Sequence, residues 1–326
     1  MTRNAQNEWT EIGSLALVVV LLFFASGCSV KKYAINKLGD SLAKSGTTYS
    51  SDDDPELVGQ ALPFSLKLIE GLLAESPKHQ GLLFAASSGF TQYSYVYVQQ
   101  QADELENKDV VRAAELRLRA RKLYLRARDY GLRALIARHP GFEDRLRHEP
   151  RVAVRILGKR DVPAAYWTAA SWAAAIGVSK DNPDTVAEQP QVEALIDRTA
   201  ELDPDFDHGA IDSFLISYEP ARQGVPGDPA QRSQLHFERA VKMSDGGMAA
   251  PYVALAESVA QPKQNRAQFD SLLKQAIAID ADARPQWRLS NLIYQRRARW
   301  LLSQEDELFV ETLRPAAANA GVQAAH

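Results

Sequence analysis

Histidines and alternating aspartates are the residues of this sequence that could support catalysis or hold a metal. The six histidines are His79, His139, His148, His208, His236 and His326. No two of them are four residues apart, so no helix would present a pair of imidazoles to a metal. Asp203, Asp205 and Asp207 alternate as in a calcium loop, but the glycine and glutamate of an EF-hand do not follow, and helix capping explains them better. Glycine-rich phosphate loops and Gly-x-Ser-x-Gly elbows are also missing, so we expect no enzyme, no metal site and no cofactor.

Aromatic residues on predicted helices are the next candidates, and their chemistry would be ligand binding. Phe90, Tyr93 and Tyr97 share one helical face, and Trp167 and Tyr218 occur in later helices. We nominate these five side chains as the lining of a passage between helices. The alternative is core packing, which is the commoner role of an aromatic stripe.

A basic stretch supplies candidates for a polar contact. Arg119, Arg126 and Arg133 recur every seven residues beside an apolar stripe. We nominate Arg126, Arg128 and Asp129 as the polar end of the passage or as contacts to a partner. A solvated helix face is the simpler alternative, and an acidic protein or the phosphate surface of a membrane would also suit these charges. With a net charge of −3 and an export signal, we expect no nucleic acid partner.

The amino-terminal segment indicates export and lipidation. An uninterrupted apolar run over 15–24 is followed by Ala25-Ser26-Gly27-Cys28, which resembles a bacterial lipobox. The run is shorter than the roughly 20 residues that span a bilayer, so we expect 1–27 to be a signal peptide and Cys28 to carry the lipid. An uncleaved anchor helix is the alternative. Ser29, where an aspartate would retain the protein in the inner membrane, slightly favours the outer membrane and a periplasm-facing domain.

The elements that would position these residues are helices that end at recurring joints. One helix must stop near Pro204, because a proline there would lose a backbone hydrogen bond and clash with the preceding turn. Similar joints occur at 73–77, 136–140, 240–245 and 276–281. The equivalent positions Leu202, Met243 and Ile279 are 41 and 36 residues apart, near the 34-residue period of a tetratricopeptide hairpin. We therefore expect an all-α fold, an array of degenerate tetratricopeptide-like helical hairpins that forms a compact α-solenoid.

Helix signals also place the domain boundaries. With 45% hydrophobic and 24% charged residues, the 326-residue chain can bury a full core. Residues 28–51 are expected to be a lipidated tether with at most one short helix. Asp54 can cap a helix that starts at Pro55 and is kinked, not ended, by Pro63, so we expect the helical domain to occupy 52–310. Residues 311–326 would be a frayed tail. Further helices are expected at 81–101, 109–139 and 206–218.

Seven segments in order along the chain resemble one known family. They are 51–58 (SDDDPELV), 61–64 (ALPF), 88–93 (SGFTQY), 123–132 (LYLRARDYGL), 166–170 (YWTAA), 214–219 (FLISYE) and 296–302 (RRARWLL). Together they resemble the T component associated with tripartite ATP-independent periplasmic (TRAP) transporters, over about 28–309.

The resemblance implies an all-helical lipoprotein that forms a homotrimer and docks a TRAP-type periplasmic solute-binding protein. A passage through each subunit is taken in this family to suggest a small hydrophobic or organic-acid ligand. The family has no agreed ligand residues, so only the lipidated cysteine is carried over, onto Cys28. The alternative hypothesis is a scaffold lipoprotein that organises envelope protein complexes without transport.

Overall fold

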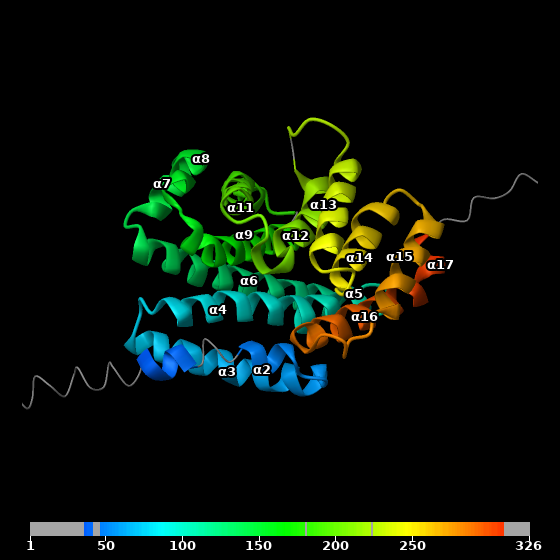
Figure 1. Cartoon of the computed structure of the whole chain (residues 1–326), viewed down its shortest axis with the longest axis horizontal. Coiled ribbons are helices and arrows are strands. Elements are labelled where there is room, and N and C mark those ends of the chain that lie inside the picture. The colour runs from blue at the N-terminus through cyan, green and yellow to red at the C-terminus, as the bar shows by residue number, and fades with distance from the viewer. Residues whose placement is uncertain (1–35, 42–45, 180, 223, 310–326) are drawn as a thin grey trace, which may run out of the picture.

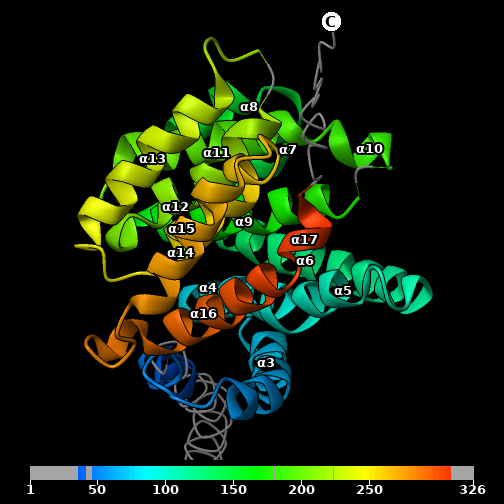
Figure 2. The same ribbon diagram turned by 90° about the vertical axis from the view of Figure 1, so that its right-hand side faces the viewer.

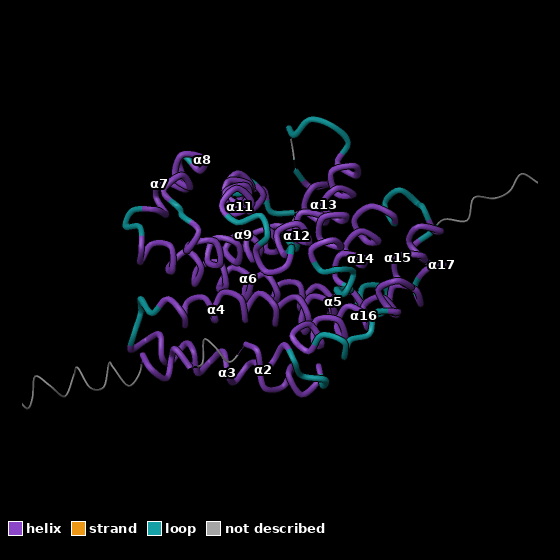
Figure 3. Tube along the Cα trace, viewed as in Figure 1, coloured by secondary structure: helices purple, strands orange, loops and turns teal. Residues whose placement is uncertain are grey.

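The computed structural model describes residues 36–41, 46–179, 181–222 and 224–309, and every regular element within these ranges is a helix (Figures 1 and 3). The all-α prediction is therefore confirmed. The predicted signal peptide (1–27), Cys28 and the predicted tail (311–326) lie outside the described residues.

The first long helix, α3 (Pro55–Glu75), begins at its predicted cap. The Asp54 carboxylate accepts hydrogen bonds from the backbone N–H groups of Glu56 (3.0 Å) and Leu57 (2.9 Å). A proline at the start of a helix costs nothing because its nitrogen would have no partner there. Pro63 lies inside α3 without ending it, as predicted.

Other helices follow at short intervals. The longer ones are α4 (Gln80–Ser94), α6 (Val110–Arg138), α9 (Val162–Gly177), α11 (Gln189–Leu202), α12 (Ala210–Tyr218), α13 (Pro229–Met243), α15 (Arg266–Ala278) and α16 (Arg288–Ser303). The short ones are α2 (Gly46–Ser50), α5 (Gln100–Leu105), α7 (Phe142–His148), α8 (Pro150–Ala153), α10 (Pro183–Val186), α14 (Ala250–Leu255) and α17 (Glu305–Leu308). Two π-helical turns, η1 (Tyr95–Gln99) and η6 (Ala256–Ala260), and 3-10 turns η2 (Val154–Ile156), η3 (Lys159–Asp161), η4 (Phe206–His208), η5 (Glu219–Ala221) and η7 (Pro285–Trp287) connect them.

All five predicted joints are helix ends. The helices that stop there are α3, α6, α11, α13 and α15. Two predicted helices differ in detail from the structure. The helix expected at 81–101 extends through α5 and contains the π turn η1, and the helix expected at 206–218 starts four residues late because Gly209 is left-handed (φ 91°). The expectation of at most one short helix in the tether is wrong, because two short helices, 36–41 and α2, lie within it.

Successive long helices stack in layers (Figure 1). α3 packs on α4, α4 on α6, α6 on α9 and α9 on α11, while α12 to α16 form the second half of the array. The last long helix, α16, returns to contact α2 and α3 (Figure 2). The array is therefore closed upon itself and compact.

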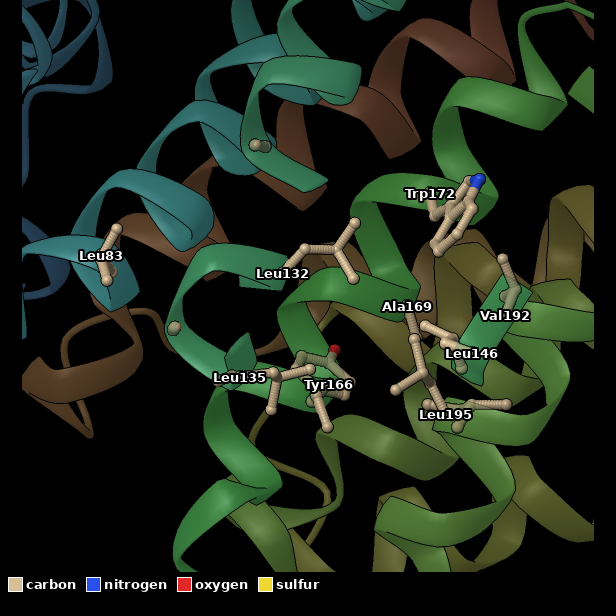
Figure 4. Close-up of a cluster of buried hydrophobic side chains, with 14 of the residues drawn as sticks. Leu83, Leu132, Leu135, Leu146, Tyr166, Ala169, Trp172, Val192 and Leu195 are labelled. Atoms are coloured by element: carbon tan, nitrogen blue, oxygen red, sulfur yellow. The ribbon is translucent and has the colours of Figure 1, made fainter. Parts of the chain in front are cut away.

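The largest core cluster lies where α4, α6, α9 and α11 meet. Figure 4 shows leucines of α6 pointing toward Tyr166, Ala169 and Trp172 of α9, with Val192 and Leu195 of α11 beyond them. A separate core cluster is shared by α13, α14, α15 and α16. The first of these clusters holds the helix faces that carry the candidate site in fixed positions, since Phe90 belongs to it and Tyr93 and Tyr130 pack against it.

Candidate binding surface between α3, α4 and α6

The predicted ligand residues divide into two groups. Phe90, Tyr93 and Tyr97 lie on α4 and η1, whereas Trp167 and Tyr218 lie on α9 and α12. Within the described residues no ring contact joins one group to the other.

The first group faces arginines of α6. The Phe90 ring is buried and stacks on Tyr130 with the ring centroids 6.0 Å apart and an interplanar angle of 11°. The guanidinium carbon of Arg126 lies 5.4 Å from the centre of the Phe90 ring, and that of Arg133 lies 5.1 Å from the Tyr130 ring. Such distances allow cation–π attraction.

Two more tyrosines extend this arrangement toward η1. The Tyr93 and Tyr97 rings are 5.6 Å apart, and Arg119 lies 5.9 Å from the Tyr93 ring while donating a hydrogen bond of 3.3 Å to its hydroxyl. The Tyr97 hydroxyl donates to the backbone carbonyl of Pro55 (2.6 Å). Tyr97 thereby ties η1 to the start of α3.

Together these side chains form what we call the aromatic–arginine row. Its members are Phe90, Tyr93, Tyr97, Tyr130, Arg119, Arg126 and Arg133. The seven-residue spacing of the arginines along α6 puts one guanidinium beside each aromatic side chain or pair.

One carboxylate, Glu70 of α3, faces the middle of the row. The Tyr130 hydroxyl donates to it at 2.7 Å, Lys67 donates at 2.5 Å, and the nearest Arg126 nitrogen is 3.7 Å away. Burial alone would raise the pKa of Glu70, but the hydrogen bonds from Lys67 and Tyr130 and the charge of Arg126 lower it below its ordinary value. Burial, followed by the hydrogen bond to Glu70, raises the pKa of Tyr130 to about 12. Glu70 is therefore ionised and Tyr130 neutral at neutral pH.

Two arginines of the row, Arg119 and Arg126, are exposed, whereas Arg133 is partly buried and donates to the Pro77 carbonyl oxygen (3.2 Å). The side chain of Arg126 is 47% exposed, and its distance to Glu70 is too long for a hydrogen bond. A guanidinium held over an aromatic face can bind a carboxylate through its free N–H edge. The row can therefore receive an anion that carries an apolar body.

The second group is packed within the core. Trp167 and Phe214 both contact the ring of Tyr166, with centroid distances of 5.2 and 6.4 Å, and Tyr218 stacks on Phe214 at 5.1 Å. Tyr218 is buried, and burial raises the pKa of its hydroxyl above the ordinary value. These contacts fix how α9 and α12 pack.

The predicted partner residues are also separated. Arg126 belongs to the row, but Arg128 pairs with Asp129 (2.8 Å) and Glu188 (3.4 Å) and lies 5.0 Å from the Trp172 ring. Arg128 and Asp129 thus form a contact toward α9 and α11, away from Arg126.

The comparison with known proteins agrees with this helical array. The sequence profile of the TRAP transporter T-component family matches residues 51–309. The chain belongs to this family. An uncharacterised protein of Treponema pallidum (strain Nichols) is 29% identical over 311 residues, which cover 88% of this chain and 94% of that protein. The family is a transporter component and not an enzyme family, and it associates the chain with TRAP transport and with the cell envelope.

A buried ionic cluster of this T-component was not predicted from the sequence. Arg297 of α16 donates to Glu257 of η6 (2.6 Å) and to Asp103 of α5 (3.1 Å), and its own side chain is 9% exposed. Burial raises the pKa of Asp103 despite the opposing charge of Arg297. Both π turns lie beside this cluster: Glu257 belongs to η6, and the ring of Tyr95 in η1 contacts that of Tyr294 in α16 at a centroid distance of 6.1 Å and a tilt of 36°. The three ionic residues are too far apart in sequence for any local signal to have revealed them.

Two surface hollows in the described part of the T-component lie elsewhere. One is lined by residues of α2 and η7, and the other by Asp245–Gly247 and residues near Arg284. Neither is lined by the nominated aromatic residues. Among the described residues no group of three or more His, Cys, Asp or Glu side chains could hold a metal ion.

Proposed function

We propose that this T-component is a periplasm-facing lipoprotein, anchored through lipid on Cys28, that docks a TRAP-type solute-binding protein and binds or passes a small organic acid. The aromatic–arginine row is the observation that supports ligand binding. The partly exposed rings of Tyr93 and Tyr130 offer apolar surface in the same row as the exposed side chains of Arg119 and Arg126. An organic acid with a hydrophobic body matches that combination.

The family membership supports the partner and the assembly state. TRAP transport involves a periplasmic solute-binding protein, and we infer that this chain docks one as a homotrimer. The predicted lining residues Trp167 and Tyr218 would then stabilise the packing of α9 on α12. Arg128 and Asp129 would stabilise the packing of α6 against α9.

Native mass spectrometry of the full-length protein in detergent tests this proposal. The protein would be examined alone and with each TRAP-type solute-binding protein of the same cell. We expect a trimer that retains one of these proteins and a small acid.

A double variant, Arg119→Gln with Arg126→Gln, isolates the row. It should weaken acid retention at least about tenfold, because a hydrogen bond to a charged group contributes about 1.5–3 kcal/mol. Arg147→Gln is the matched control, since the Arg147 side chain is 67% exposed on α7 and pairs only with Glu143 one turn away among the contacts described. A ligand-free monomer that binds none of the solute-binding proteins would favour the scaffold alternative.

A further inference from the structure

The first long helix, α3, has two apolar faces, of which the rest of the protein covers only one. Its inner face is buried through Val58, Leu66, Ile69 and Leu73. A second face carries Leu57 (56% exposed), Phe64 (74%) and Leu68 (39%). These three positions are seven and four residues apart, so they form one row along the helix.

The alignment of these three exposed side chains on α3 distinguishes them from isolated apolar residues on a protein surface. Single exposed apolar residues are normal, but a row along a whole helix is a typical interaction surface. Between Leu57 and Ala74 the only charged residues of α3 are Lys67 and Glu70, which pair with each other on a different side. Among the described residues, α3 is also the one helix long and apolar enough to cross a membrane by length and composition. We call the three exposed residues the outer face of α3.

The start of the described chain lies at one end of this helix. The Ser76 hydroxyl donates to the side-chain oxygen of Asn36 (2.8 Å), and the His79 ring is 3.2 Å from the Asn36 carbonyl oxygen. Residue 36 is therefore fixed beside the turn that follows α3. Leu38, in the same short helix, is 49% exposed.

The length of chain before Asn36 limits how far the helix can be from the membrane. Asn36 is eight positions after Cys28 in the sequence, and a fully extended chain spans at most roughly 28 Å over that length. The 21 residues of α3 give it a length of roughly 31 Å. An anchor at Cys28 thus keeps the carboxyl end of α3 within about one helix length of the bilayer.

The position of α3 in the fold is compatible with such a contact. Figures 1 and 2 both show α3 at the lower edge of the molecule, with α11 and α13 at the opposite side. We propose that the outer face of α3 rests on the bilayer surface, with Leu57, Phe64 and Leu68 inserted at the boundary between headgroups and acyl chains. This proposal rests on the anchoring part of the proposed function and not on its ligand or partner. An apolar helix face beside a lipid anchor would add membrane affinity and fix the orientation of the domain on the bilayer.

Site-specific labelling of the full-length protein in vesicles tests the proposal. Vesicles of phosphatidylethanolamine and phosphatidylglycerol would hold the variants Phe64→Cys or Leu57→Cys, each labelled with an environment-sensitive dye. Cys28 is the sole native cysteine, so a lipidated chain presents only the introduced thiol. We expect a blue-shifted dye that spin-labelled lipid quenches several-fold more than it quenches the controls.

Two control sites match the test sites in exposure. Ala74→Cys lies on α3 but on its charged side, and Leu235→Cys replaces a leucine that is 55% exposed on α13. Both dyes should respond to iodide in water and little to spin-labelled lipid. Because Phe64 and Leu57 are largely exposed, their replacement should leave the fold intact, which circular dichroism would check.

Three results would overturn the proposal. Equal iodide quenching at positions 64 and 235 would place the outer face in water. Shielding from both quenchers that persists in detergent would mean that a second copy or another protein covers it. Labelling of the unmodified chain would show a free thiol at Cys28 and remove the anchor, while leaving the ligand-binding proposal standing.

Discussion

Replacing Gly131 by alanine should destabilise the protein even though alanine is the better helix former. Gly131 is buried in α6 where this helix crosses α9 and α4. A Cβ atom at this position would lie 2.1 Å from the Thr168 hydroxyl oxygen, 3.1 Å from the Thr168 Cβ and 3.0 Å from the Ser87 hydroxyl oxygen. The absence of a side chain is therefore what lets the three helices approach.

The magnitude follows from two opposing effects. Alanine in place of glycine inside a helix contributes about 1 kcal/mol of stability. Overpacking a filled core costs about 1–3 kcal/mol, and the upper end applies because Thr168 is fully buried and its hydroxyl already donates to the Ala164 carbonyl oxygen at 2.6 Å. We expect a net loss of about 2 kcal/mol in the free energy of unfolding.

Chemical denaturation of a double-mutant cycle measures this effect. Thr168→Ala removes the closest contact, so Gly131→Ala should cost at least about 1 kcal/mol less in that background than in the original protein. Gly71→Ala is the control, because Gly71 lies in α3 where an added Cβ would meet no atom within 4 Å, and there alanine should stabilise by up to about 1 kcal/mol. If Gly131→Ala stabilised the protein, or cost the same with and without Thr168, the steric argument would be wrong.

Three further predictions concern buried groups. Arg297→Met should cost about 3–5 kcal/mol in urea denaturation, because it removes the ion-pair partner of Glu257 and leaves Asp103 with the more distant Arg117 at 3.9 Å. A loss below about 1 kcal/mol would contradict the buried pairing. Phe142→Ala should cost about 3–5 kcal/mol, since this ring is fully buried in the largest core cluster, and full retention of the melting temperature would show that the site refills. The environment of Asp161 should make the stability of the protein sensitive to acid. Burial would raise the pKa of Asp161, but the Gly158 N–H, Arg138 and His139 lower it below its ordinary value. Its stabilising effect is present above the ordinary pKa and disappears as the pH falls through the folded pKa, so denaturation midpoints measured from about pH 5 to pH 2 should fall less steeply for Asp161→Asn.

Local signals predicted where helices begin and end. Asp54 and Pro55 define the start of α3, Asp109 caps α6 by accepting from the Arg112 N–H (3.0 Å), and the Pro204 joint follows the end of α11. Each of these features depends on a few neighbouring residues, so the sequence alone is sufficient to find them.

The two π turns could not be predicted in this way. Tyr95–Gln99 and Ala256–Ala260 each lie in a continuous apolar pattern that is equally compatible with an ordinary α-helix. The wider turn is stable here because of contacts that its own segment does not contain: Tyr95 packs on Tyr294, and Glu257 accepts from Arg297. Such contacts join residues far apart in the chain, and no period in the sequence encodes them.

The candidate site was predicted in part. The sequence reveals the heptad spacing of the arginines and the shared helical face of Phe90, Tyr93 and Tyr97. It does not reveal that the arginines of one helix contact the aromatic rings of the other. Tyr130 and Glu70 were missed as participants because their roles depend on the packing of α3 and α6 against α4.

The outer face of α3 points away from the protein, whereas another side of the same helix contacts the aromatic–arginine row. Glu70 points from α3 to Tyr130 of α6, whereas Phe64 is exposed on another side of α3. A helix held against a bilayer on one side would therefore position the row on its other side, next to the membrane surface. A hydrophobic acid that partitions into the headgroup region would then be concentrated beside the arginines that can bind its carboxylate. If both proposals hold, replacing Phe64 by a polar residue should reduce acid capture from vesicles while leaving capture from detergent solution unchanged, because only the first depends on where α3 rests.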